Sequence, residues 1–148
     1  MANHDLYQIS LKVILKNKSG NALLLKADPN GSYAGFYDLP GGRIDVDEFS
    51  ASFEKIIKRE VKEEIGKIDY TLNPKPVAIG RYLIPAKFNR SRKDTHVLYV
   101  FFEAQYKNGD IKISDEHIDH LWLNLSNQKL EKLFKSGILE GIKMYLKK

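Results

Sequence analysis

Apolar and polar residues alternate near the start of the chain, from Ile9 to Leu15. Apolar side chains occupy every second position, and polar residues such as Lys12 mostly fill the positions between them. This period of two is typical of a strand that buries one face. The turn signal Ser19-Gly20 and the apolar run Ala22 to Leu25 follow. The pattern therefore predicts a β-hairpin at the start of the fold.

A helical period replaces the alternation from Phe53 to Ile65. A rotation of about 100° per residue gathers the apolar side chains on one broad arc. The arc contains Phe53, Ile56, Ile57, Val61 and Ile65, and the opposite side contains Lys55, Lys58 and Lys62. Gly66 is a suitable helix stop. The segment therefore predicts an amphipathic helix with its apolar face toward the core.

The rest of the chain mixes apolar runs with turn signals. A long loop is expected from Asp28 to Gly42, with a short apolar insertion at Phe36 to Leu39. Strands are expected at Val77 to Ile84, His96 to Tyr106 and Leu121 to Leu123, with a tight reversal at Asn108-Gly109 into Ile111 to Ile113. A helix broken near Gly137 is expected from Leu130 to Leu146. Because the elements do not alternate strictly, the pattern favours an α/β (α+β) fold with a mixed sheet flanked by helices.

Length and composition narrow the class of protein. A chain of 148 residues with 43% hydrophobic residues fits one domain, 1–148, with a sizeable core. The absence of cysteine excludes a disulfide scaffold and any thiolate metal site. No apolar run is long enough to cross a bilayer, and the first residues lack a signal-peptide core. We therefore expect a soluble, cytoplasmic protein.

The net charge of +5 favours an anionic partner but is low for a dedicated nucleic-acid binder. Basic residues cluster in the polar segment between two expected strands, at Lys87, Arg90, Arg92 and Lys93. Such a loop can steer phosphates or RNA toward a site. A solvated loop without a ligand is the alternative, and for a charge run of this kind it is favoured.

Three acids lie on the expected helix in an unusual place. Glu60 and Glu64 fall near the middle of the apolar arc, and Glu63 falls at its edge. An inward carboxylate costs several kcal/mol unless it is paired or bound to a metal. Oxygen ligands one helical turn apart suit hard divalent ions. The alternative is that these glutamates are solvated and pair with Lys62 and Lys67, but their position on the arc, behind the Gly41-Gly42 turn, favours a metal.

These residues resemble the Nudix box, the signature of hydrolases that cleave nucleoside diphosphates linked to another moiety. The spacing from Gly42 to Glu48 and the run Arg59 to Gly66 fit the box position by position. Two departures stand out: Phe49 to Lys58 gives ten residues where the box has seven, and Lys67 occupies the final apolar position. The resemblance implies the Nudix α/β/α sandwich with a mixed central sheet.

The resemblance also implies a site. Glu60 and Glu64 would bind Mg²⁺ or Mn²⁺ most directly, and Glu63 would share in binding or orient water. The Gly41 carbonyl would offer another oxygen, and Arg59 would orient a glutamate through a charge-assisted hydrogen bond. The residue that acts as general base varies among relatives, so no single base is assigned.

Family members often carry a further acid some residues before a tryptophan. Glu116 lies six positions ahead of Trp122 and is the candidate for a further metal ligand or the base, with Asp115 as its rival. The alternative is a pair of surface acids beside a core tryptophan. His117 and His120 flank this loop and could touch phosphate, although lone histidines are usually structural or exposed.

Candidates for substrate binding are Tyr37, Arg81 and Arg90. Tyr37 could stack on a base, but an aromatic residue in an apolar segment is more often part of the core. The resulting hypothesis is a Mg²⁺-dependent hydrolase of a nucleoside triphosphate or nucleoside diphosphate derivative. The alternatives are a nucleotide-binding regulatory module on the same fold and an RNA 5′-end pyrophosphohydrolase. The resemblance also makes a homodimer plausible.

Overall fold

A mixed β-sheet of eight strands runs through residues 2–147, the part of the chain that the computed structural model describes. The strands are β1 (Tyr7–Lys16), β2 (Ala22–Ala27), β3 (Tyr37–Asp38), β4 (Gly41–Arg43), β5 (Asp69–Leu72), β6 (Ala78–Ile84), β7 (Thr95–Asn108) and β8 (His117–Leu123). The α-helices are α1 (Phe53–Ile65), α2 (Leu130–Leu133) and α3 (Ser136–Leu146). Short 3₁₀ turns are η1 (Val46–Glu48), η2 (Ala86–Phe88) and η3 (Leu125–Asn127).

Strands β1 and β7 form the centre of the sheet and pair in parallel from Tyr7 opposite His96 to Lys16 opposite Gln105. β5 and β6 pair antiparallel with the two ends of β7. On the other side of β1, β2 is paired only at Lys16, whereas β4 pairs with residues 10–12. β2 in turn pairs antiparallel with β8 and with β3. The sheet therefore divides beside β1, and β4 lies at this division.

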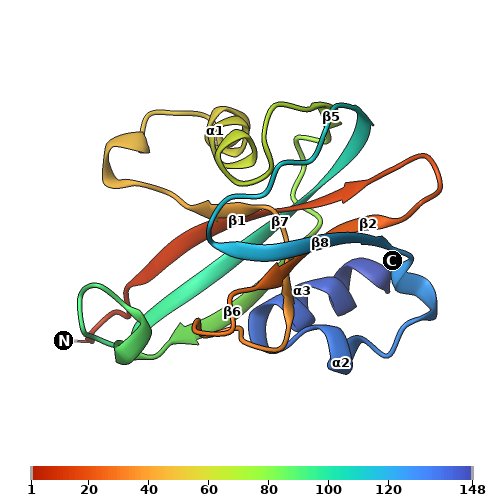
Figure 1. Cartoon of the computed structure of the whole chain (residues 1–148). Helices are drawn as coiled ribbons and strands as arrows, with labels where there is room; N and C mark the ends of the chain where they lie inside the picture. The colour runs from red at the N-terminus through yellow and green to blue at the C-terminus, as the bar shows by residue number, and fades with distance from the viewer. Residues whose placement is uncertain (1, 148) are drawn as a thin grey trace.

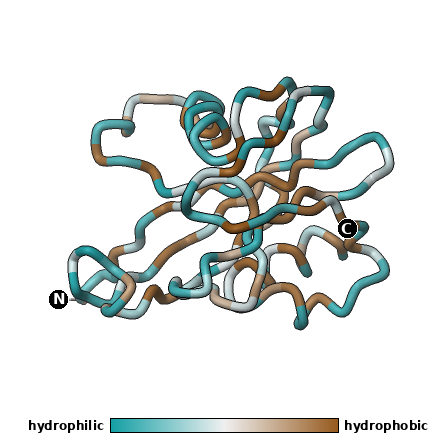
Figure 2. Tube along the Cα trace, viewed as in Figure 1, coloured by the Kyte–Doolittle hydropathy of each residue, from teal (hydrophilic) through white to brown (hydrophobic). Residues whose placement is uncertain are grey.

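Helices cover both faces of the sheet (Figure 1). On one face α1 packs Ile57, Val61 and Ile65 against strand residues such as Leu11 and Phe102. On the other face α3 packs its apolar side against a second cluster; its members include Ile138, Ile142, Tyr99 and Phe101. Apolar residues concentrate along the strands between these layers (Figure 2). The arrangement confirms the predicted fold class, a mixed sheet flanked by helices.

The first strand differs from its prediction on one face. A half-exposed strand was expected, yet Ser10 is only 2% exposed and Lys12 only 6%. Apolar side chains on the alternate face, such as Leu11, pack under α1. The polar face is buried because it forms one wall of a cleft, together with Tyr99 of β7.

Helix α1 has the predicted bounds. The Ser52 side chain caps its start by accepting a hydrogen bond from the Lys55 amide. Gly66, with φ of 89°, ends it, and its N–H donates to the Lys62 carbonyl. Phe53, which the predicted arc would bury, is instead 48% exposed. Its ring meets that of Phe102 edge-on, with the ring centroids 6.1 Å apart.

The C-terminal helix is broken near Gly137, as predicted, at residues 134–135 between α2 and α3. Two other predictions need correction. Ile111 to Ile113 do not form a strand; this segment instead runs past the end of α1, where the amides of Lys112 and Ser114 donate to its last carbonyls. β5 was not predicted, and β8 begins earlier than expected, at His117. None of the helices within residues 2–147 is long and apolar enough to cross a membrane.

Candidate active site

Because Gly41 and Gly42 have no side chain, the backbone of β4 lies in close contact with β1 and with Glu60 of α1. Gly41 has φ of 133°, and a Cβ there would lie 2.9 Å from the Leu11 carbonyl carbon. A Cβ on Gly42 would lie 2.7 Å from Glu60 Oε1 and would overlap the rest of that carboxylate. The Gly41 N–H also donates to Glu64 Oε1 at 2.8 Å. Both glycines are therefore needed for the close contact between the turn and the helix carboxylates.

Gly42→Ala is expected to displace the Glu60 carboxylate while the fold survives, because the neighbour it meets is a side chain. Binding of Mn²⁺, followed by isothermal titration calorimetry, should weaken about 10-fold or more. Gly41→Ala is the contrasting variant, because its Cβ meets the Leu11 backbone at a positive φ. It should lower the thermal unfolding midpoint clearly. Unchanged Mn²⁺ binding by Gly42→Ala would contradict the expected role of Glu60.

The three acids of α1 differ in burial, as their positions on the helical arc predict. Glu60 and Glu64 are buried, 8% and 4% exposed, whereas Glu63 is exposed. Burial raises the pKa of Glu60, although Arg59 beside it acts in the opposite direction. Burial also raises the pKa of Glu64 to about 7, against the lowering effect of Lys12. The two inner glutamates are therefore not solvated helix charges, and neither has an ion pair with Lys62 or Lys67 in the described part of the chain.

Arg59 joins the acids of the helix to Glu48. Its Nε and Nη2 donate to the two Glu48 carboxylate oxygens at 2.8 and 2.6 Å, and Nη2 lies 3.0 Å from Glu60 Oε1. These hydrogen bonds raise the pKa of Arg59 and lower the pKa of Glu48. Residues 49–52 form the turn between η1 and α1, and Arg59 makes its two-pronged contact with Glu48 despite the longer spacing.

A buried network that the sequence did not reveal lies behind Glu64. The Lys12 ammonium lies 3.0 Å from Asp38 Oδ1 and donates to the Leu39 carbonyl at 3.4 Å. His117 lies between two carboxylates, with Nε2 3.5 Å from Asp38 Oδ2 and Nδ1 3.6 Å from Glu64 Oε2. β1, β3, β8 and α1 thus each contribute one side chain to a line of charged and polar groups.

Charge pairing outweighs burial in this network. Burial would raise the pKa of Asp38, yet Lys12 and His117 hold it at about 2. Burial would likewise lower the pKa of Lys12, but Asp38 and Glu64 raise it. The pKa of His117 rises because Asp38 and Glu64 outweigh its desolvation. Asp38 and Lys12 therefore remain charged at neutral pH.

These groups open into a cleft of about 830 Å³. Its walls include the acids Glu60, Glu63 and Glu64 of α1, with Glu116 of the loop before β8. Aromatic side chains also line it: Tyr33, Tyr82, Tyr99 and Phe88. The hydroxyls of Tyr33 and Tyr99 form a hydrogen bond at 3.1 Å. The ring of Tyr33 also packs on that of Tyr82, with centroids 4.8 Å apart.

Some of the remaining candidate residues line the cleft and others lie away from it. Glu116 and Arg90 line the cleft, whereas Asp115, Lys87, Arg92 and Lys93 are not among its walls in the described chain. Arg81 lies on the outer face of β6 and lines a separate small hollow with Tyr7 and His96. Tyr37 and Trp122 pack against the two apolar clusters. His120 is half-buried away from the cleft walls, so of the two histidines only His117 reaches the site.

The oxygen ligands of the cleft are too few to enclose a divalent cation alone, but they can hold one together with other ligands. Within residues 2–147, no three acidic or histidine side chains are gathered closely enough to enclose an ion on their own. Two buried carboxylates packed against the Gly41-Gly42 turn nevertheless fit Mg²⁺, which is usually held by one or two carboxylates with water and substrate phosphates. The cleft can therefore accommodate such an ion together with a phosphorylated ligand.

Comparison with known proteins gives the same assignment. A family model described as the NUDIX domain matches residues 6–139. Nucleoside triphosphatase NudI of Escherichia coli O81 (strain ED1a) is 25% identical over 111 residues, which cover 74% of this chain and 77% of NudI. The family match spans the Nudix box and all the strands of the sheet.

Solved structures agree in fold. The crystal structure of the MutT protein from Methanosarcina mazei Go1 superposes with a TM-score of 0.68 at 26% identity, covering 99% of this chain and 95% of that one. An ADP-ribose pyrophosphatase from Streptococcus suis 89-1591 has a TM-score of 0.60 at 22% identity, covering 96% and 91%. With the box, the buried glutamates and the family match in agreement, this chain belongs to the NUDIX domain family and is a Nudix hydrolase.

Proposed function

We propose that this enzyme cleaves the phosphoanhydride bond of a nucleoside triphosphate or a nucleoside diphosphate derivative, with Mg²⁺ or Mn²⁺ as cofactor. The observation that carries the proposal is the burial of Glu60 and Glu64 against the Gly41-Gly42 turn, in the wall of an open cleft. The raised pKa values of these two carboxylates fit a site that binds a cation in the active enzyme. Relatives described as a nucleoside triphosphatase and an ADP-ribose pyrophosphatase fit the same substrate class.

Each side chain has a part in the proposed reaction. Glu60, Glu64 and the Gly41 carbonyl would hold the metal, which neutralises phosphate charge and lowers the pKa of bound water. Glu63 and Glu116 face the same space and are candidates for orienting the attacking water or accepting its proton. Arg59 fixes Glu60 through its contact at 3.0 Å. The protein thus positions the acids, and its aromatic wall is suited to the nucleoside.

The proposal is tested with a panel of nucleoside triphosphates, ADP-ribose and dinucleoside polyphosphates, each incubated with Mg²⁺ and resolved by ion-exchange chromatography. At least one member should yield a nucleoside monophosphate, and Glu64→Gln should abolish most of that turnover. Tight nucleotide binding without product would favour a regulatory binding module instead. RNA as substrate has little support, because Arg90 is the one member of the basic stretch among the cleft walls in the described chain.

Metal binding is expected to release a proton and to strengthen as pH rises. The pKa of Glu64 is about 7 because the group is buried, so much of it is protonated below neutrality in the metal-free protein. A carboxylate must lose its proton to bind the ion. The affinity for Mn²⁺ should therefore increase from pH 6 to about pH 8 and then level off.

Calorimetry in two buffers of different ionisation enthalpy measures the released proton directly. Glu64→Gln removes the titrating group and serves as the control, so its residual Mn²⁺ binding should change much less with pH. An affinity for Mn²⁺ that is constant across this range in the wild type would contradict the expectation.

A further inference from the structure

One face of the sheet is only partly covered by α1. The uncovered part lies beyond the first turn of α1. There Tyr7 of β1 and Leu83 of β6 flank His96 of β7, so the three residues form a row across neighbouring strands. In the same face Ile79 lies opposite Val100. Tyr7, Leu83 and Ile79 are 38%, 41% and 49% exposed. The sheet extends past α1 toward the N-terminus with no helix above it (Figure 1).

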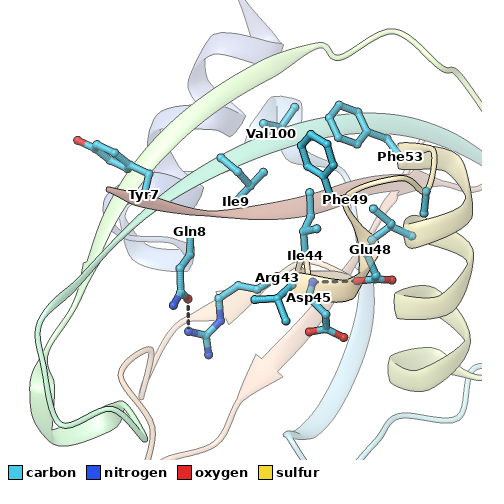
Figure 3. A pocket seen from close by; sticks show the side chains of 13 residues that line it. Tyr7, Gln8, Ile9, Arg43, Ile44, Asp45, Glu48, Phe49, Phe53 and Val100 are labelled. Atoms are coloured by element: carbon cyan, nitrogen blue, oxygen red, sulfur yellow. Dashed lines mark hydrogen bonds between the residues drawn. The ribbon is translucent and has the colours of Figure 1, made fainter. Parts of the chain in front are cut away.

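The η1 turn overhangs this uncovered part and encloses an apolar hollow of about 1080 Å³ (Figure 3). Ile9 and Val100 of the sheet and Phe53 and Ile56 of α1 line the hollow. On its rim Val46 and Phe49 are 101% and 94% exposed. We refer to the exposed residues Tyr7, Val46, Phe49, Phe53, Ile79 and Leu83 as the open face.

The open face has the area that a stable interface requires. With about 200 Å² for a fully exposed aromatic side chain and about 100 Å² for an aliphatic one, it exposes about 550 Å² of apolar side-chain surface. A standard interface buries about 800 Å² on each partner, of which roughly 60% is apolar. The apolar part of such an interface is therefore already present on one chain.

The charges around the open face indicate which partner fits it. Among residues 2–147, no lysine lines the hollow or the row beside it, although the chain carries 24 lysines and arginines and a net charge of +5. The charged residues of β4, β6 and the η1 turn that line them are mixed in sign: Arg43, Arg81, Asp45 and Glu48. A twofold contact places a residue of one copy opposite a different residue of the other, so arginines can meet acids. On this face two basic chains can therefore meet without placing like charges opposite one another.

The shape is also complementary to itself. Val46 and Phe49 protrude beside the hollow, so a partner must offer both a recess for them and a projection to fill the recess next to them. A second copy offers both. Aromatic residues and arginine without lysine are also the composition that interface cores favour.

We propose that the open face is the interface of a homodimer in which the Val46–Phe49 turn of each copy packs into the apolar hollow of the other. Glu48 lies in this turn and binds Arg59, which contacts Glu60. The dimer therefore fixes the turn that orients a box arginine, and each site is supported by the other copy.

Sedimentation velocity across a concentration series tests the interface without any measurement of turnover. The wild type should sediment as a dimer at micromolar concentration, and Phe49→Asp should sediment as a monomer. Met144→Asp is the matched control, because Met144 is 45% exposed on α3, on the opposite side of the sheet, and should leave the dimer intact. A monomeric wild type, or a Phe49→Asp variant that stays dimeric, overturns the proposal.

A second test does not depend on disrupting the interface. The chain contains no cysteine, so Val46→Cys and Met144→Cys each carry a single thiol. The rate of thiol alkylation at position 46 should be slow in concentrated protein and should rise on dilution, whereas the rate at position 144 should not change. Equal, concentration-independent rates at the two positions overturn the proposal. Because neither test involves nucleotide cleavage, their outcomes are separate from the test of hydrolysis.

Discussion

Glu64→Gln is expected to lower kcat for the best nucleotide substrate by at least about 100-fold. Changes to groups that only support a metal ligand cost about 10 to 100-fold, so loss of a ligand itself should cost more. Glu54→Gln is the matched control, since it makes the same change on the exposed side of the same helix. The test is steady-state turnover at saturating Mg²⁺. Equal kcat values for wild type and Glu64→Gln would contradict the proposed role.

The same variant should be more stable than the wild type when metal is removed. The pKa of Glu64 is about 7 in the folded protein because of burial, against an ordinary value of 4.5. The folded state therefore favours the protonated acid, and stability falls as pH rises from about 5 to above 7. Urea denaturation in chelator at pH 8 should show a gain on the order of 1 kcal/mol for Glu64→Gln, and that gain should vanish near pH 5.

Asp38→Asn is expected to destabilise the protein by about 3 kcal/mol, because the buried Lys12 ammonium loses its carboxylate partner. Asp5→Asn is the matched control. Asp5 also contacts a histidine, His96, at 2.7 Å, but both groups are partly exposed and the expected loss is below about 1 kcal/mol. Urea denaturation at pH 7 measures both variants. Losses of the same size would contradict a stabilising role for the buried pair.

The dependence of this loss on pH has a defined sign. Lys12 and His117 outweigh burial and hold the pKa of Asp38 at about 2 in the folded protein, against 3.8 for the free group. The stabilisation by Asp38 is therefore present above pH 4 and is lost as pH falls toward 2. Adding Lys12→Met to Asp38→Asn should recover most of the stability at pH 7, because no unpaired charge then remains buried.

Asp38→Asn should also lower kcat by about 10 to 100-fold, through His117. The imidazole of His117 lies between Asp38 and Glu64, so losing the Asp38 charge loosens the group that borders Glu64. His117→Gln, which keeps a polar side chain of similar reach, should retain more activity than His117→Ala. If both retain full activity, this network stabilises the fold and does not affect the chemistry.

Local pattern was sufficient for the parts of the site that lie close together in the sequence. Helix α1, its end at Gly66 and the inward placement of Glu60 and Glu64 all follow from a period of about 3.6 residues, because each depends on neighbours within one or two turns. The contact between Glu48 and Arg59 could not be placed from the longer spacing alone. Its geometry depends on the turn after η1, which no periodicity describes.

Long-range contacts explain what the sequence did not reveal. Lys12, Asp38 and His117 come from three separate strands, and their partners lie 26 or more residues away. Lys12 looked like the exposed face of a strand, because a polar residue that lines a buried cleft has the same alternation as one in solvent. Ile111 to Ile113 looked like a strand because nothing local shows that Lys112 and Ser114 bind the end of α1.

The position of β1 has a consequence for the synthesis of this chain. β1 is translated before the other strands, yet it lies at the centre of the sheet and pairs along its length with β7, Lys16 opposite Gln105. Most of the chain must therefore leave the ribosome before this strand can find its parallel neighbour, and contacts so distant in sequence form slowly. Until then the edge of β1 that pairs with β7 has no backbone partner, and an unpaired strand edge of this kind favours aggregation of incomplete chains.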